Sequence, residues 1–226
     1  MLLMENSGLN RPLQTILFGV RSPIVVEFEE VCTRAGVSII AAVSVDGSPR
    51  LSNRQAVVSL KEIGDQFKGY TFVPVAFYPR RRRALTDLAL AKGLTPSPPI
   101  IDPSAVIFSS ARVHGGSFVN AQAVIGGCSI IGNFCLVNRS TSIGHHTIVE
   151  DYVSIGPGVT LASNIRIGEG CVIGAGTTIL PNVTIGADSF IAAGSIVRRS
   201  VERGMLVSGN PGRAIRPHVH RDNQDE

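Results

Sequence analysis

The fold of this protein is decided by residues 143–173, which read IGHHTIVEDYVSIGPGVTLASNIRIGEGCVI. Every sixth residue of this stretch is Ile, Val or Leu, and the same spacing runs without a break from Ile101 to Val197. A period of six is neither the 3.6-residue period of an α-helix nor the simple alternation of a strand. It is the sequence signature of a parallel β-helix built from hexapeptide repeats.

The repeat also predicts the local geometry. Each hexad supplies one short strand and one turn, and three hexads make one triangular coil whose aliphatic side chains stack along the axis. A small or β-branched residue stands four positions after each aliphatic residue, where a larger side chain would clash. Gly often follows the aliphatic residue, as at Gly126 and Gly144, and Gly and Asn accept the positive φ of tight turns. The alternative, a β-sandwich, would show a period of two and irregular turns.

Composition narrows the class of protein. The chain has 226 residues, enough for one large or two small domains, and a net charge of only +4. Aromatic residues make up 5%, whereas a nucleic-acid-binding protein more often carries a basic face with interleaved aromatic side chains. The chain has no apolar run long enough to span a membrane, and with Glu5 near its start we expect no secretory signal. We therefore expect a cytoplasmic protein that binds neither nucleic acid nor membrane.

Three of the four cysteines fall within the repeat, at positions that favour a small apolar residue: Cys128, Cys135 and Cys171. We expect buried free thiols there, which fits a reducing compartment.

Strands alternate with helices before the repeats, which predicts a small parallel α/β unit of the Rossmann-like kind. Apolar runs predict strands at 15–20, 37–45 and 72–77 and helices at 23–35 and 80–92. The predicted divisions are a leader at 1–14, an α/β domain at 15–94, a stiff linker at 95–100, a β-helix at 101–199 and a C-terminal tail at 200–226. Residues 200–217 are expected to fold back irregularly, and residues 218–226 to be disordered.

Two features of the α/β unit suggest a ligand. Asp46 follows the second strand, at the edge where ligands bind in open α/β sheets, although an Asp before a Gly is also an ordinary turn residue. The arginine run Arg80–Arg83 opens the second helix. Either these arginines form a solvated first turn of the helix, or one of their guanidinium groups binds the phosphate of a nucleotide.

The polar exception within the repeat is the adjacent pair His145 and His146. Ile143 points into the core, so both histidines fall on an outward corner of the coil. A histidine on a surface is often only a surface residue. However, its pKa range suits proton abstraction near neutral pH, and a rigid corner is a good support for a base.

Several short motifs resemble the nucleotide-sugar acetyltransferases of the left-handed β-helix superfamily. The similar branch contains the bacillosamine-pathway, perosamine and sialic-acid acetyltransferases, and the resemblance extends from about residue 15 to about residue 217. The most specific motifs are IDPSA at 101–105, VN at 137–138, His145, ASNIRIG at 162–168 and VSGNP at 207–211. The resemblance implies a left-handed β-helix acyltransferase domain at 101–199 and a nucleotide-sugar-binding domain at 15–94.

The resemblance also implies a mechanism and a co-substrate, acetyl-CoA. The residue matching His145 is the general base that deprotonates the sugar amine, or less often a hydroxyl, as it attacks the thioester directly. Asn138 would line the same pocket, and His146 would stand beside the base. The acetyl-CoA would lie in a groove between two subunits of a homotrimer. The implied cofactor contacts are Ser154, Ala175, Ala193, Asn210 and Pro211.

The acceptor implied by the resemblance is a nucleotide-linked amino sugar for surface polysaccharide or glycan synthesis, held by the α/β unit. The implied substrate contacts are Gly19, Arg21, Ser22, Asp46 and Arg80.

This chain departs from the family pattern at three places. The family usually has an acid directly after the base, where this chain has His146, so the support for His145 is either missing or comes from elsewhere, with Glu150 and Asp151 as the candidates. Ser154 replaces a second family histidine near the thioester. The Gly-rich turn after the first strand is reduced to residues 19–22.

Zinc carbonic anhydrases also occur among trimeric left-handed β-helix proteins. A zinc site of that kind needs three convergent ligands. Adjacent His145 and His146 point in different directions, and His114 lies about five hexads earlier. We therefore predict no metal.

Two rivals to an N-acetyltransferase remain at the level of sequence. One is a sugar O-acetyltransferase. The other is a non-catalytic β-helix that binds a sugar nucleotide or a protein partner. A carboxylate within hydrogen-bond reach of His145 would favour the enzyme.

Overall fold

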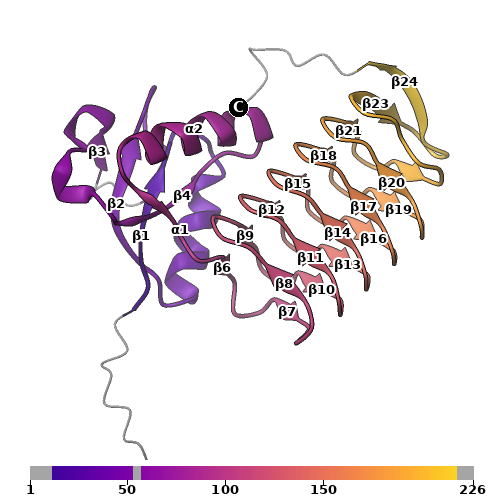
Figure 1. Ribbon diagram of the computed structural model, residues 1–226, viewed down its shortest axis with the longest axis horizontal. Helices are drawn as coiled ribbons and strands as arrows, with labels where there is room; N and C mark the ends of the chain where they lie inside the picture. Colours follow the sequence, from indigo (N-terminus) through magenta and orange to yellow (C-terminus); the bar gives the residue numbers. More distant parts are fainter. Residues whose placement is uncertain (1–11, 53–56, 218–226) are drawn as a thin grey trace, which may run out of the picture.

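The computed structural model describes residues 12–52 and 57–217. An α/β unit lies against one end of a long stack of coils (Figure 1). Residues 1–11 of the predicted leader and residues 218–226, which were expected to be disordered, lie outside the described residues.

The α/β unit contains a five-stranded parallel sheet with the order β3-β2-β1-β4-β5. Its elements are β1 (Gln14–Phe18), α1 (Val25–Arg34), β2 (Ser38–Ser44), β3 (Val57–Ser59), β4 (Thr71–Pro74), α2 (Pro79–Ala91) and β5 (Thr95–Pro96), with 3₁₀ turns at Leu60–Glu62 and Asp65–Phe67. The predicted parallel α/β unit is confirmed. Strands β3 and β5 were not predicted, because both are short and lie at the edges of the sheet.

The segment expected to be a linker joins the two parts of the molecule closely. Thr95–Pro96 pairs with β4, and the Ser97 amide donates to the Phe72 carbonyl at 2.9 Å. Ile100 already begins the first coil, pairing with Phe118. Residues 95–100 therefore extend the sheet and enter the β-helix without a free stretch between them.

Seventeen two-residue strands form the β-helix. They are β6 (Ile100–Ile101), β7 (Val106–Ile107), β8 (Arg112–Val113), β9 (Phe118–Val119), β10 (Val124–Ile125), β11 (Ile130–Ile131), β12 (Leu136–Val137), β13 (Ser142–Ile143), β14 (Ile148–Val149), β15 (Ser154–Ile155), β16 (Thr160–Leu161), β17 (Arg166–Ile167), β18 (Val172–Ile173), β19 (Thr178–Ile179), β20 (Thr184–Ile185), β21 (Phe190–Ile191) and β22 (Ile196–Val197).

The strands form three parallel sheets, which we call faces. Face I holds β7, β10, β13, β16, β19 and β22; face II holds β8, β11, β14, β17 and β20; and face III holds β6, β9, β12, β15, β18 and β21. Partners on one face stand one full coil of three hexads apart, as in the pairing of Ser142 with Thr160. The tail, expected to be irregular, continues face III as a hairpin of β23 (Met205–Ser208) and β24 (Arg213–Pro217).

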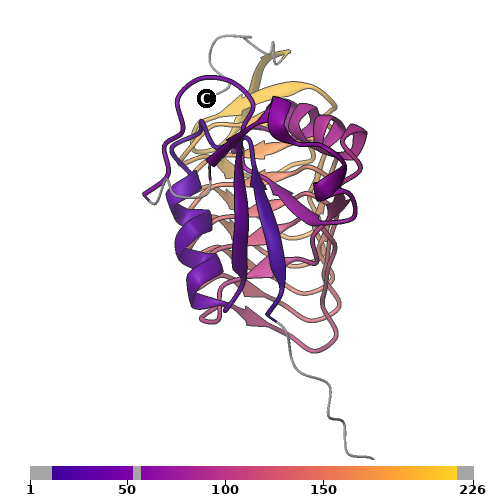
Figure 2. The same cartoon turned by 90° about the vertical axis from the view of Figure 1, so that its left-hand side faces the viewer.

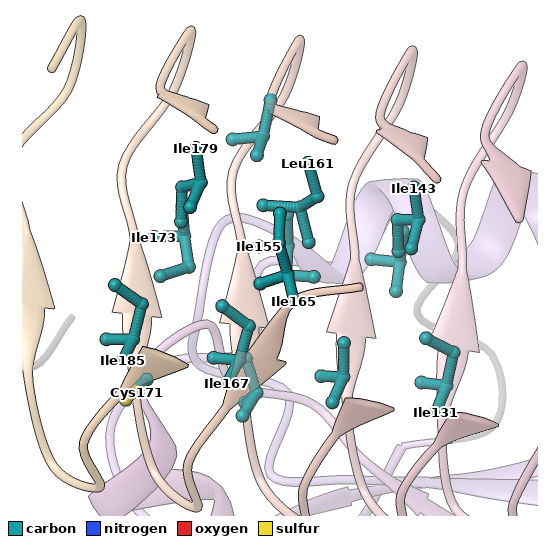
Figure 3. Close-up of a cluster of buried hydrophobic side chains, with 14 of the residues drawn as sticks. Ile131, Ile143, Ile155, Leu161, Ile165, Ile167, Cys171, Ile173, Ile179 and Ile185 are labelled. Carbon is teal, nitrogen blue, oxygen red and sulfur yellow. The ribbon is translucent and has the colours of Figure 1, made fainter. Parts of the chain in front are cut away.

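The aliphatic ladder fills the interior, as the period predicts (Figure 3). Ile155 and Ile173, on neighbouring strands of face III, are fully buried and stack along the axis. In the first coil, Ile101 and Ile107 are only half-buried, because no earlier coil covers them. Stacking supplies the core that a single coil cannot form.

The turns differ from the expectation in one respect. From Val113 to Ile191, the positive φ falls on the third residue after each aliphatic residue of the ladder, as at Phe134, His146 and Tyr152. The Gly that follows the aliphatic residue has another role. A Cβ at Gly144 would lie 2.4 Å from the Ala162 carbonyl oxygen, so Gly permits the close approach of successive coils.

The expectation of buried thiols is right at two of the three repeat cysteines and wrong at Cys128. Cys135 and Cys171 are buried, and burial raises the pKa of each to about 12. Cys128 occupies one of the positive-φ turn positions, with φ of 60°, and is exposed. Its side chain points away from the axis because the turn residue faces solvent.

Both helices of the α/β unit pack against the β-helix (Figure 2). The ring of Phe28 on α1 stacks on Phe118 of face III, with centroids 3.9 Å apart. On the side of α2, Phe134 stacks on Tyr152 at 5.1 Å, at the corner between faces II and III. These apolar contacts hold the sheet of the α/β unit in a set position over the first coils.

Candidate functional site

His145 and His146 lie on the corner between faces I and II, as the repeat predicted. Both are exposed, and the φ of 55° at His146 turns the chain between β13 and β14. The Nδ1 atoms of the two imidazoles are 2.9 Å apart, and the rings are nearly perpendicular at 89°. One Nδ1 must therefore donate a proton and the other must accept it.

The expectation that Glu150 or Asp151 orients His145 is wrong. Both acids lie on the corner between faces II and III, where Glu150 pairs with Arg166 and Asp151 accepts from the Asn133 amide at 2.7 Å. Within residues 12–52 and 57–217, no carboxylate forms a hydrogen bond or an ion pair with either histidine. His146 is the polar neighbour that the structure places at the Nδ1 of His145.

Asn138 lies on a different corner, between faces III and I. It is only 6% exposed, and its Oδ1 accepts from the Asn120 side chain at 3.1 Å and from the Arg139 amide at 2.8 Å. Glu27 of α1 binds Asn120 at 2.9 Å and Arg139 at 2.7 Å. Asn138 thus belongs to a polar joint between α1 and the coil, and one chain does not bring it to His145.

The structure does bring together four of the five predicted co-substrate contacts. Ala175 and Ala193 occupy equivalent positions in successive coils on the corner between faces III and I. Residues 209–212 lie across the last coil, where the Gly212 amide donates to the Ile196 carbonyl at 2.7 Å. Asn210 and Pro211 are therefore held beside the last coil, at the end of the β-helix that is nearer to Ala193 than to Ala175.

Ser154 is not a surface contact in this structure. It is fully buried, and its hydroxyl bonds to the Phe77 carbonyl and accepts from Arg82 at 2.9 Å. The position faces the α/β unit because face III is the covered face. Hence Ser154 cannot touch a ligand that lies on the surface of this chain.

Arg82 is a buried arginine whose structural role the sequence analysis did not predict. The guanidinium is 1% exposed and donates to the carbonyls of Phe134, Ala76, Phe77, Tyr152 and Val153 at 2.6–3.1 Å. Burial lowers the pKa of Arg82 to about 10, so it stays protonated near neutral pH. A signal was available, because Arg82, Leu85, Thr86 and Ala89 follow the helical spacing of a buried face.

The other arginines of the run have separate partners. Arg81 forms an ion pair with Asp46, while Arg83 bonds Glu169 at 2.6 Å and lies 4.2 Å over the Tyr152 ring. Arg80 is exposed on the first turn of α2. The run is therefore not a wholly solvated first turn, since Arg82 is buried and Arg81 and Arg83 form ion pairs. Contact of one of its guanidinium groups with a nucleotide phosphate stays a prediction.

The predicted substrate contacts gather at the carboxyl edge of the α/β sheet. Arg21 pairs with Asp46 at 3.6 Å, and Arg81, which was not predicted, pairs with the same carboxylate. Ser22 is buried at the start of α1. Gly19 has φ of 87°, and a Cβ there would lie 2.4 Å from Leu85, so this turn requires glycine.

A basic hollow of about 350 Å³ lies at the far end of the β-helix. Its lining residues are Arg198, Arg199, Pro211, Gly212 and Arg213. In the part of the chain that the structure describes, no carboxylate pairs with these three arginines. Uncompensated guanidinium groups around one hollow favour an anionic ligand such as a phosphate.

Neither a metal cluster nor a membrane span is found among the described residues. No three His, Cys, Asp or Glu side chains in these ranges come together as a possible metal site. No helix there has the length and apolar character needed to cross a membrane.

Comparison with known proteins identifies relatives of the whole architecture. A family model described as bacterial transferase hexapeptide (six repeats) matches residues 164–199, and no curated protein sequence matches the chain. Perosamine N-acetyltransferase from Caulobacter crescentus, as a histidine-to-asparagine variant in complex with CoA and GDP-perosamine, aligns with a TM-score of 0.80 and 26% identity over 90% of this chain and 96% of that chain.

Two further solved structures align over nearly the same length. The acetyltransferase domain of PglB from Neisseria gonorrhoeae, in complex with acetyl coenzyme A, gives a TM-score of 0.79 and 26% identity over 91% of this chain and 100% of that chain. WeeI from Acinetobacter baumannii gives 0.75 and 20% over 91% and 100%, which supports the fold alone.

The fold and these similarities define the class: the chain is an acyltransferase with a left-handed β-helix of hexapeptide repeats. Within this class it is similar to the sugar acetyltransferases, as the sequence motifs predicted.

Proposed function

We propose that this chain transfers the acetyl group of acetyl-CoA to an amino group of a nucleotide-linked sugar used for a surface polysaccharide or glycan. Similar solved structures hold CoA with GDP-perosamine, or acetyl coenzyme A, which supports this substrate pair. The observation that carries the proposal is the alignment of His145 with the basic hollow on one corner of the β-helix.

The alignment follows from the register. Arg199 lies three full coils after His145, and each is the second residue after an aliphatic residue of face I, Val197 and Ile143. Because strands of one face are about 4.8 Å apart, the two backbone positions are separated by about 14 Å. Acetyl-CoA has its thioester at one end of a long flexible arm and its phosphates at the other. Laid along this corner, it would place the thioester at His145 and the phosphates at the arginines.

The acceptor would be held by the α/β unit. Arg21 and Arg81 converge on Asp46 at the carboxyl edge of the sheet, where nucleotides bind in open α/β folds. The carboxylate would accept hydrogen bonds from hydroxyl groups of the nucleotide, and the arginines would pair with its phosphates. The contacts between α1, α2 and the first coils keep this edge in a fixed relation to the β-helix.

The chemistry assigned to His145 is general base catalysis. As the sugar amine attacks the acetyl carbonyl, Nε2 takes a proton from the amine nitrogen, the new C–N bond forms and the C–S bond breaks. The same proton then passes to the leaving thiolate, so that no covalent intermediate forms on the enzyme. Holding both substrates in place would supply much of the rate acceleration.

The complete site would form between copies of the chain in a homotrimer. The predicted contacts are divided between two corners: His145 lies on one, and Asn138, Ala175 and Ala193 lie on the other, with face I between them. A groove between neighbouring copies would bring one corner of each together. Large apolar side chains beside face I, Val106 at 51% and Phe108 at 52% exposed, are suited to such a contact.

Two alternatives are distinguished by experiment. A sugar O-acetyltransferase would use the same base on a hydroxyl group. A non-catalytic binding scaffold is favoured by one observation, namely that no carboxylate among the described residues orients His145.

The test is thiol release from acetyl-CoA against a panel of amino-sugar and hydroxy-sugar nucleotides, with the oligomeric mass of the protein measured in parallel. We expect turnover with an amino-sugar nucleotide and a mass of three chains. Turnover only with an acceptor that lacks an amino group would establish the O-acetyltransferase. No turnover together with no shift of the melting temperature by acetyl-CoA would overturn the proposal.

The basic hollow gives a second prediction. Replacing Arg199 with Gln should raise KM for acetyl-CoA about 3- to 10-fold and leave kcat within about 2-fold, because an exposed charge-assisted contact to phosphate is lost away from the reacting atoms. The matched control is Arg216→Gln, an exposed arginine of β24 that does not line the hollow. Equal KM values for both variants would rule out the hollow as the phosphate site.

A further inference from the structure

Two arrangements of protons satisfy the contact between the two imidazoles, and they differ in which ring donates. With Nδ1 atoms 2.9 Å apart, a neutral pair must consist of one ring protonated on Nδ1 and the other protonated on Nε2. If His146 donates, His145 carries its proton on Nε2 and has no lone pair there. If His145 donates, its Nε2 is an exposed lone pair available to an acceptor amine.

We propose that His146 is a positioning residue that accepts the Nδ1 proton of His145 and so holds Nε2 of His145 as the base. This inference rests on the proposed function and specifies how the base is prepared. His146 would act where a carboxylate orients the imidazole in a catalytic triad, fixing both its tautomer and its rotation. It is not itself in contact with the reacting atoms.

The surroundings support a role for His146 as the partner. Among the described residues, neither histidine has another side-chain hydrogen bond or ion pair. The equivalent turn positions in the coils before and after His146 hold Cys128 and Asn164, and Asn164 bonds Asn182 at 2.7 Å. The acids nearest in sequence, Glu150 and Asp151, are engaged on another corner.

The turn itself allows a clean removal of the imidazole. Glycine occupies the equivalent positive-φ position at Gly158, Gly176 and Gly194, so His146→Gly leaves the backbone unstrained. The long polar side chain of Gln122 occupies another, with φ of 58°, so His146→Glu and His146→Lys also fit. Glu can only accept a hydrogen bond at neutral pH, and Lys can only donate one.

The first measurement is ¹⁵N NMR of the histidine side chains in the full-length protein without substrates. We expect His145 to be protonated on Nδ1 and His146 on Nε2. Protonation of His145 on Nε2 would overturn the proposal whether or not the protein is active. This result is independent of turnover, so a protein that shows the expected tautomers but transfers no acetyl group would count against the proposed function alone.

The second measurement is steady-state kinetics. His146→Gly should lower kcat about 10- to 100-fold, as loss of an orienting partner typically does, with both KM values within about 2-fold of wild type. His146→Glu should recover kcat to within about 3-fold of wild type, and His146→Lys should stay as low as His146→Gly. Equal activity of the Glu and Lys variants, or full activity of His146→Gly, would contradict an acceptor role.

Discussion

Replacing His145 with alanine is expected to lower acetyl transfer about 10²- to 10⁴-fold, the range that a general base contributes. The loss should appear in kcat, because the side chain acts on the proton of the attacking amine and not on the binding of either substrate. His145 is exposed on a turn, so its removal leaves no cavity in the core. The measurement is thiol release from acetyl-CoA with the best acceptor of the panel, together with the shift of melting temperature caused by acetyl-CoA.

The matched control is His114→Ala. His114 is also an exposed histidine of the repeats, but it follows β8 and so lies on the corner between faces II and III. We expect it to keep wild-type kcat within about 2-fold. If His145→Ala retains full turnover, the base is another group. If wild type and variant bind acetyl-CoA equally and neither turns over any acceptor, the non-catalytic scaffold gains support.

Replacing Arg82 with methionine is expected to lower the free energy of unfolding by about 3–5 kcal/mol, the usual effect of removing one partner from a buried charged network. The guanidinium joins α2 to the corner of the β-helix, and its loss would leave buried carbonyls such as those of Phe134 and Val153 without this donor. For a chain of this size the melting temperature should fall by roughly 6–20 °C. Denaturant and thermal unfolding measure both quantities.

The control for Arg82 is the neighbouring Arg83→Met. The Arg83–Glu169 pair has side chains 42% and 46% exposed, so we expect a change of less than about 1 kcal/mol. A change at Arg82 as small as the one at Arg83 would show that the buried network adds little to stability. Arg82 also bonds Ser154 and Phe77 where α2 meets the β-helix. The Met variant should therefore bind the nucleotide-sugar more weakly than Arg83→Met.

Much of the architecture could be predicted from local patterns. The six-residue period predicted the β-helix and its buried ladder, because the same pattern of side chains recurs in every coil. The helical spacing of Val25, Phe28, Val31 and Cys32 predicted α1, and all four are buried. The hairpin of β23 and β24 was missed because its strands are defined by pairing with β21, not by their own pattern.

The candidate site was predictable only in part. The outward position of His145 follows from its place after Ile143 in a hexad, and its role as base stays a prediction. The hydrogen-bond partners of Ser154 and Glu150 could not be predicted from their neighbours in sequence. Ser154 meets Arg82 of the α/β unit, far earlier in the chain, and Glu150 meets Arg166 in the next coil. Such contacts depend on which face the α/β unit covers.

The amino-acid sequence by itself determined the coil, the direction of each repeated side chain and the exposure of the two histidines, because these follow from local periodicity. Only the tertiary structure decided what each polar side chain meets. The packing of the α/β unit on face III buried Arg82 and Ser154 together, so the contact between these two residues is structural and does not form a ligand site. Stacking of the coils placed Arg166 beside Glu150, so that this acid is paired on the corner between faces II and III and not with His145. The physical reason is that hydrogen bonds and ion pairs need atoms within a few ångströms, a distance that is set between segments by packing and not along the chain.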